Sequence, residues 1–191
     1  MAKVKVLVFV LASLPLACII WLALQQQLGP NPGKALIHYF AHSAVCLLLL
    51  TLSLAPLSRL PRLRKAKQLS RLLGLYSFFY AVLHFLAYLA FTTGFRWAVF
   101  AEDITDRPYA YVGMLALVIL LLMAVTSTQG WQRRLKRNWK KLHNLVFVAL
   151  LLIIIHIFWV ARSDLIWAVS YGSLAAFLII WRLFNRWLYK Y

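Results

Sequence analysis

The chain has 191 residues, of which 64% are hydrophobic, and a formal net charge of +17. Soluble domains are nearer one half apolar, and the polar links between the apolar stretches are too short to form a separate soluble domain. The basic residues lie in these links, where they set membrane topology, and they form no aromatic-interleaved patch of the kind that binds nucleic-acid strands. We therefore expect one domain over residues 1–191, embedded in a lipid bilayer, with no nucleic-acid partner.

Six apolar stretches predict the fold, because each approaches the roughly 20 residues that a helix needs to cross a bilayer. In chain order they are approximately Val4–Leu24, Leu36–Ser58, Leu72–Thr93, Tyr109–Ser127, Leu142–Val160 and Leu165–Trp181. The sequence therefore predicts an all-α integral membrane protein with six transmembrane helices.

The charged residues divide unevenly between the two ends of these helices. Of the 21 Lys and Arg, 17 lie at the termini or in the loops 59–71 and 133–141, which share one side of the membrane. The other four and all four acidic residues share the second side: Lys34, Arg96, Arg107, Arg162, Glu102, Asp103, Asp106 and Asp164. Because basic loops stay inside, both termini are expected in the cytoplasm.

Histidines within the apolar stretches are the first candidate functional residues, because a basic side chain in hydrocarbon is costly and marks a functional site. His84 and His156 lie about 12 and 14 residues from the cytoplasmic starts of their helices, which places them at heights of roughly 18 and 21 Å. Two imidazoles at matched depth are suited to hold one haem iron between them. The chain has no CxxCH motif, which excludes covalent c-type attachment.

His143 and Arg71 raise the question of a second haem. His143 lies thirteen residues before His156, or about 20 Å lower, but this spacing rotates an ideal helix by about 220°. A tilted or distorted helix, or differently placed haems, would reconcile the two positions. Arg71 lies thirteen residues before His84 and is either a haem-binding residue or a plain topology-setting charge. His38 and His42 share one helix face and either bind a metal or a quinone or face interfacial water.

Other functions are open on this reasoning alone. His84 and His156 are also suited to interhelical hydrogen bonds, and a non-redox transporter would use histidines as relays. Such transporters usually carry intramembrane carboxylates, and these six stretches have none. The chain also has no GxGxxG motif for a dinucleotide, which argues against a self-contained NADPH oxidase or ferric reductase.

A family resemblance appears in four parts of the chain. They are LGLYSFFYAVLH at 73–84 with the preceding Arg71, DITDRPY at 103–109, TSTQGWQRRLKRNWKKLHNLVF at 126–147, and the downstream His156. Together they resemble the MsrQ family, formerly called YedZ, which belongs with the ferric-reductase-like transmembrane domains.

The resemblance implies a b-type haem protein of the bacterial inner membrane with one or two haems, whose ligands fall on His84, His143 and His156. It implies electron transfer from the quinol pool or a cytoplasmic flavin reductase to a periplasmic molybdopterin-containing methionine sulfoxide reductase subunit, which carries the catalytic site. The segments Gly94–Pro108 and Ala161–Asp164 are expected to contact that partner. FMN and quinone are further cofactors associated with the family, although no residue here identifies an FMN site.

The chain departs from the wider ferric-reductase pattern in its third apolar stretch. That pattern has two histidines there, whereas this chain has only His84, with Arg71 at the lower position. A second haem is therefore not expected to be held by two histidines. The alternative function is a stand-alone quinol-linked or metal-reducing b-type cytochrome whose acceptor is a small molecule.

Overall fold

The computed structural model describes residues 2–161 and 165–188, and every element in these ranges is helical. Six helical stretches in them are long and apolar enough to cross a membrane. They are Lys3–Leu24, Pro32–Leu57, Leu63–Thr93, Pro108–Val125, Arg137–Val160 and Ile166–Asn185. The prediction of an all-α protein with six membrane-spanning helices is confirmed.

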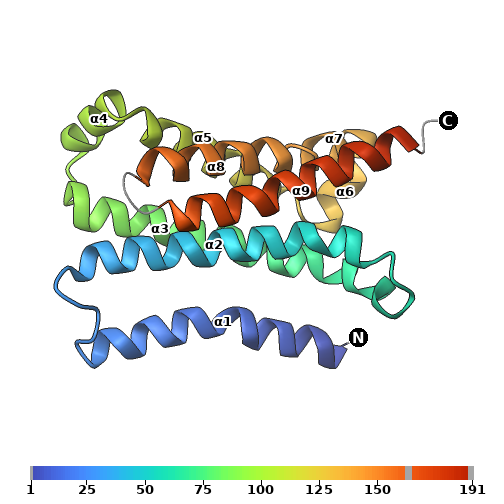
Figure 1. Ribbon diagram of the computed structural model, residues 1–191, viewed down its shortest axis with the longest axis horizontal. Helices are drawn as coiled ribbons and strands as arrows, with labels where there is room; N and C mark the ends of the chain where they lie inside the picture. The colour runs from blue at the N-terminus through green and yellow to red at the C-terminus, as the bar shows by residue number, and fades with distance from the viewer. Residues whose placement is uncertain (1, 162–164, 189–191) are drawn as a thin grey trace. The chain divides into compact units, whose positions relative to one another are not determined.

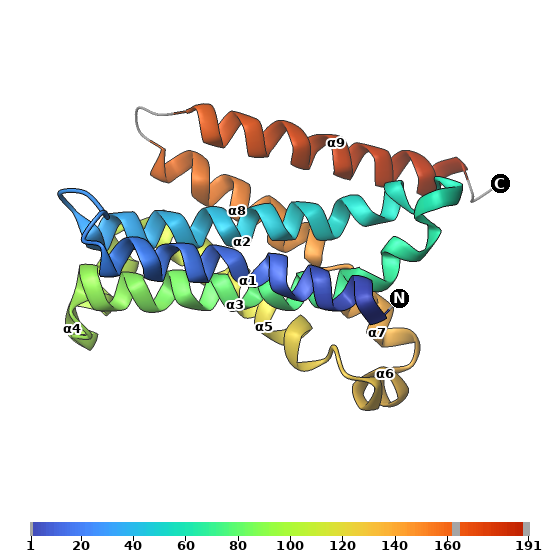
Figure 2. The same cartoon turned by 90° about the horizontal axis from the view of Figure 1, so that it is seen from below.

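The chain forms two compact units, Met1–Asp103 and Ile104–Tyr191. The first unit is built from α1 (Ala2–Leu24), α2 (Pro32–Leu57), the 3₁₀ helix η1 (Pro61–Leu69), α3 (Ser70–Tyr88), the π-helical turn η2 (Leu89–Thr93) and the start of α4 (Trp97–Asp106). Figures 1 and 2 both show α2 and α3 side by side, with η1 joining them at one end. α1 packs on both of these helices.

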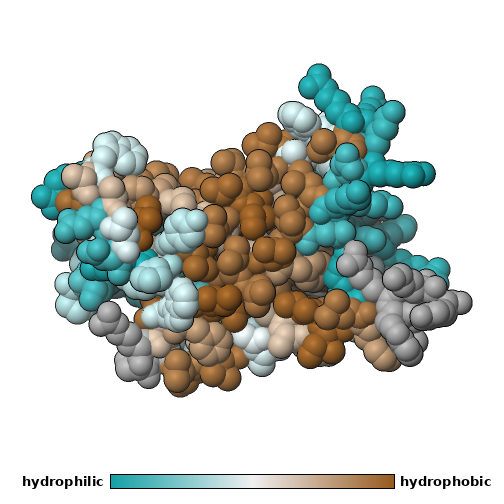
Figure 3. Space-filling view, turned by 90° about the horizontal axis from the view of Figure 1, so that it is seen from above, coloured by the Kyte–Doolittle hydropathy of each residue, from teal (hydrophilic) through white to brown (hydrophobic). Residues whose placement is uncertain are grey.

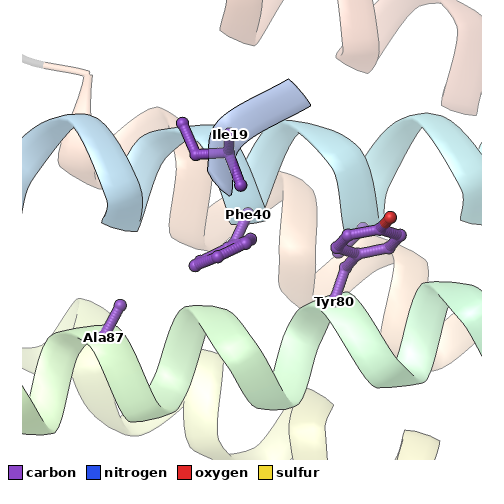
Figure 4. Packing of buried hydrophobic residues seen from close by; sticks show 5 residues of the cluster. Ile19, Phe40, Tyr80 and Ala87 are labelled. Carbon is purple, nitrogen blue, oxygen red and sulfur yellow. The ribbon is translucent and has the colours of Figure 1, made fainter. Parts of the chain in front are cut away.

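The core of the first unit centres on Tyr80, whose side chain is fully buried. Its ring stacks against Phe40, with ring centroids 6.4 Å apart, and Ile19 and Ala87 belong to the same cluster (Figure 4). Buried aromatic rings of this size remove a large apolar area from contact with the surroundings. This cluster joins α1, α2 and α3.

The Tyr80 hydroxyl also reaches the backbone of α1 near a proline. It donates a hydrogen bond to the carbonyl of Ala12 (2.8 Å) and accepts one from the amide of Leu16 (3.1 Å). Pro15 lies between these two backbone groups, inside the continuous helix α1. The Tyr80 hydroxyl therefore joins α3 to the turn of α1 that contains the proline.

The second unit contains α5 (Pro108–Val125), α6 (Gln129–Leu135), α7 (Arg137–His143), α8 (Val146–Val160) and α9 (Ile166–Leu188). α8 packs against both α5 and α9. Ala116 of α5 and Ala149 of α8 are almost completely buried. Small residues let helix backbones approach closely where no water drives association, so these alanines explain the tight α5–α8 pair.

The outer faces of the helices carry large apolar side chains. Trp21, Ile166 and Ile180 are each more than 60% exposed, which is expected of side chains that contact lipid rather than water. Figure 3 shows hydrophobic residues over the middle of the helices and hydrophilic ones toward their ends. The structure thus has the surface of a membrane protein.

Three regions expected as connecting loops contain helices, and the first is 59–71, which contains η1 and the start of α3. The segment 94–108 contains α4, on which Trp97, Phe100 and Ile104 recur with helical spacing. The Phe100 ring contacts Phe85 of α3 and Trp97, and the Tyr88 hydroxyl donates a hydrogen bond to the Asp103 carboxylate. Likewise, the basic segment 129–143 forms α6 and α7. Apolar residues at every third or fourth position among polar ones favour such short surface helices.

Candidate haem-ligand histidines

His156 lies on α8 with its ring half-buried against α5. Its Nδ1 is 2.7 Å from the backbone carbonyl oxygen of Tyr109. Because a carbonyl can only accept, Nδ1 donates this hydrogen bond, and in a neutral imidazole the lone pair then resides on Nε2. The local structure therefore selects Nε2 as the nitrogen that can bind a metal.

His84 on α3 is held in the same way within the first unit. Its half-buried ring places Nδ1 2.9 Å from the carbonyl oxygen of Ile37 on α2. In both cases the carbonyl belongs to the residue 47 positions before the histidine. Histidines that bind metals almost always donate their other ring N–H to such an acceptor, which fixes the tautomer and the ring orientation. The two histidines therefore each make an interhelical hydrogen bond, the alternative that the sequence left open, and this same bond gives the tautomer that a metal ligand would need.

His143 has a different environment at the last residue of α7. Its Nδ1 is 3.2 Å from the carbonyl oxygen of Trp139, one turn earlier in the same helix. The imidazole also stacks on the Trp139 indole. His143 is thus oriented mainly by its own helix, unlike His84 and His156.

The sequence had placed His143 and His156 on one apolar helix. In the structure they do not lie on one uninterrupted α-helix. α7 ends at His143 and α8 begins at Val146, and the amides of Leu145 and Phe147 bond to carbonyls three residues earlier. Each step of such a 3₁₀ turn rotates the chain by about 120° rather than about 100°. This local distortion is of one kind that would reconcile the thirteen-residue spacing, because it increases the rotation between the two histidines toward a whole number of turns.

Arg71 is the second residue of α3, and its side chain is exposed. Arg71 and His84 belong to the first unit, whereas His143 and His156 belong to the second. No group of three or more His, Cys, Asp or Glu side chains that could hold a metal occurs in the part of the chain that the structure describes.

Three features beside these histidines were not identified from the sequence. The carbonyl oxygens of Ile37 and Tyr109 are backbone atoms and leave no trace in residue identity. Gly113 of α5 faces the ring of His156, so close that a Cβ atom added there would lie 2.9 Å from Nδ1. An isolated glycine within a helical pattern commonly has a packing reason, so Gly113 was the only one of the three with a sequence signal.

Arg182 of α9 is a further side chain that the sequence left as a topology charge. It donates a 2.5 Å hydrogen bond to the amide oxygen of Asn144, the residue after His143. Its guanidinium also lies 4.4 Å from the centroid of the Phe147 ring, a favourable cation–π arrangement. Arg182 therefore fastens α9 to the turn between α7 and α8.

Comparison with known proteins identifies the family. The family described as "Ferric reductase like transmembrane component" matches residues 39–154. The protein-methionine-sulfoxide reductase heme-binding subunit MsrQ of Xanthomonas axonopodis pv. citri (strain 306) is 38% identical over 188 residues, which are 95% of this chain and 86% of that protein. The chain belongs to the MsrQ family. The resemblance seen in the sequence motifs is thereby confirmed.

A second MsrQ relative supports the same assignment. The subunit of the same name from Xanthomonas campestris pv. campestris (strain B100) is 40% identical over 169 residues, which are 87% of this chain and 78% of the relative. Its name, like that of the first relative, describes a heme-binding subunit of a methionine sulfoxide reductase. No solved structure matches the chain.

Proposed function

We propose that this chain is the b-type haem subunit of a methionine sulfoxide reductase system in the bacterial inner membrane. It carries electrons from quinol or a cytoplasmic flavin reductase to a periplasmic molybdopterin-containing catalytic subunit that repairs oxidised envelope proteins. The observation that carries this proposal is the shared geometry of His84 and His156, each of which donates Nδ1–H to a backbone carbonyl on a neighbouring helix. MsrQ relatives with heme-binding names support it.

The residues present suit a haem. His84 and His156 supply axial Nε2 atoms, their carbonyl partners hold the tautomer, and the surrounding apolar helices keep water away. When bound, haem iron supplies a one-electron couple between its ferric and ferrous forms. In this proposal His84 and His156 hold one haem together. His143, with Arg71 as a neighbouring charge, serves a second haem nearer the cytoplasm.

The charge distribution supports the direction of transfer. With the termini and the loops 59–71 and 133–141 in the cytoplasm, electrons enter near His143 and leave at the opposite membrane face. The exit face then includes α4, with Glu102, Asp103 and Asp106, and this helix contacts the catalytic partner. The second expected contact is Ala161–Asp164. Of this segment, Arg162 to Asp164 lie outside the residues that the structure describes.

The test begins with the purified chain in detergent or nanodiscs. A haem-to-protein ratio and reduced-minus-oxidised spectra establish haem content, and the reduced protein is then mixed with the molybdopterin partner or with ferric chelates. We expect a b-type spectrum and rapid oxidation by the partner alone. A chain that stays colourless when haem is supplied would favour a histidine relay in a transporter. Oxidation by ferric chelates but not by the partner would instead indicate a stand-alone cytochrome.

A further inference from the structure

Gly113 occupies a position in α5 where any side chain would collide with His156. A Cβ atom built on Gly113 would lie 2.9 Å from Nδ1 and 3.0 Å from Cε1 of the imidazole. Real Cβ atoms essentially never approach other atoms below 3.0 Å. The observed ring position therefore depends on the absence of a side chain at residue 113.

The contact coincides with the hydrogen bond that orients the ring. Tyr109, whose carbonyl accepts from His156 Nδ1 at 2.7 Å, lies one helical turn before Gly113. Because Gly113 has no side chain, the imidazole of His156 can lie directly against α5 and reach the Tyr109 carbonyl. Helix formation does not explain the glycine, because a mid-helix glycine is about 1 kcal/mol less favourable than alanine.

We propose that Gly113 is a positioning residue for His156. It seats the imidazole against α5, so that Nδ1 donates to Tyr109 and Nε2 keeps the lone pair that binds iron. This inference rests on the proposed haem function and extends it to a residue that does not itself touch the iron. Residues that orient a metal ligand typically change metal affinity 10- to 100-fold when they are altered.

The test compares Gly113→Ala with Gly74→Ala. Gly74 lies in the membrane helix α3, and a Cβ there would meet only the Thr51 methyl at 3.7 Å, an ordinary contact. Titration of haem into the apoprotein should show a roughly 10- to 100-fold loss of affinity in Gly113→Ala, with a changed Soret band and midpoint potential. The Gly74→Ala control should match wild type. Wild-type affinity, spectrum and potential in Gly113→Ala would overturn the proposal.

A second comparison separates positioning from simple helix packing. In a His156→Ala background the ring is absent, so adding Gly113→Ala should lower neither the thermal unfolding temperature of the apoprotein nor its yield in membranes, because alanine is the better helix former once no clash opposes it. The same glycine substitution should lower both in the presence of His156. An equal loss in both backgrounds would show that Gly113 serves helix packing alone.

The apoprotein measurement also keeps the two proposals distinct. If the wild-type chain binds no haem, the haem function fails, while the steric dependence of Gly113 on His156 is still decided by thermal unfolding. If the wild-type chain binds haem and Gly113→Ala does so equally well, the haem function stands and the positioning role is wrong.

Discussion

The imidazole of His143 stacks on the indole of Trp139, with ring centroids 3.9 Å apart and ring planes 25° apart. The indole Nε1 in turn donates a 2.9 Å hydrogen bond to the carbonyl of Thr126, just after the end of α5. A chain of contacts thus connects the end of α5 to Trp139 and then to His143. This chain of contacts gives His143 a fixed orientation, although His143 lies at the junction of α7 and α8.

Removal of His84 or His156 should abolish one and the same haem. Each of His84→Ala and His156→Ala leaves an axial position of the iron empty, so haem content should fall by about one equivalent per chain in either variant. The double variant should lose no more than either single variant. Pyridine haemochrome assays on purified protein measure this, with His38→Ala, an exposed position on α2, as the control. Additive losses would mean that the two histidines bind different haems.

His143→Ala should spare that haem and remove or perturb a second one. Trp139→Leu removes the stacking partner of His143. It should shift the midpoint potential and spectrum of the second haem in the same direction as His143→Ala but by less, because the ligand stays while its orientation loosens. Redox titration with optical detection resolves the two components. If His143→Ala is spectroscopically identical to wild type, His143 is not a haem ligand.

Arg71 is tested by comparing alanine with lysine. Loss of a positive charge near a haem favours the ferric form. Arg71→Ala should therefore reduce the midpoint potential of the second haem, the one proposed to lie nearer the cytoplasm, by about tens of millivolts. Arg71→Lys should restore most of this potential if charge alone matters, and little of it if the guanidinium fork binds a propionate. Haem content and potential equal to wild type in both variants would leave Arg71 only its role in membrane topology.

Tyr80→Phe should weaken the attachment of α1. The substitution removes the hydroxyl that bridges Ala12 and Leu16 and should cost about 1 kcal/mol of unfolding free energy. Tyr76→Phe is the matched control, because its hydroxyl partner Ser13 also bonds to the Phe9 carbonyl and keeps that bond. The thermal unfolding temperature in detergent should therefore be highest for wild type, intermediate for Tyr76→Phe and lowest for Tyr80→Phe. The reverse order of the two variants would contradict this account.

The membrane helices were predictable because their signal is local. A continuous apolar run such as 142–160 has few alternatives to a spanning helix, since an unpaired backbone in lipid is costly. α4 was treated as part of a loop because its ten residues mix acids with aromatics. Its packing depends on Phe85 and Tyr88, which lie in another helix and are invisible to a local pattern.

The histidines were found from the sequence because an imidazole within an apolar run is conspicuous. Their orientation was not predictable, because it depends on the backbone carbonyls of Ile37 and Tyr109, and every residue has such a carbonyl. The turn at Asn144 and Leu145 was also missed, since both residues keep nearly helical backbone angles. The thirteen-residue spacing indicated either a tilted or distorted helix or differently placed haems, and it did not locate the turn.

The bridge between Tyr80 and α1 has a consequence for biosynthesis. The hydroxyl comes from a residue more than sixty positions downstream of Ala12 and Leu16, so it is still unsynthesised when the first span leaves the ribosome. The first span therefore enters the bilayer without these two hydrogen bonds. They form only once the third span has been translated and has assembled beside it.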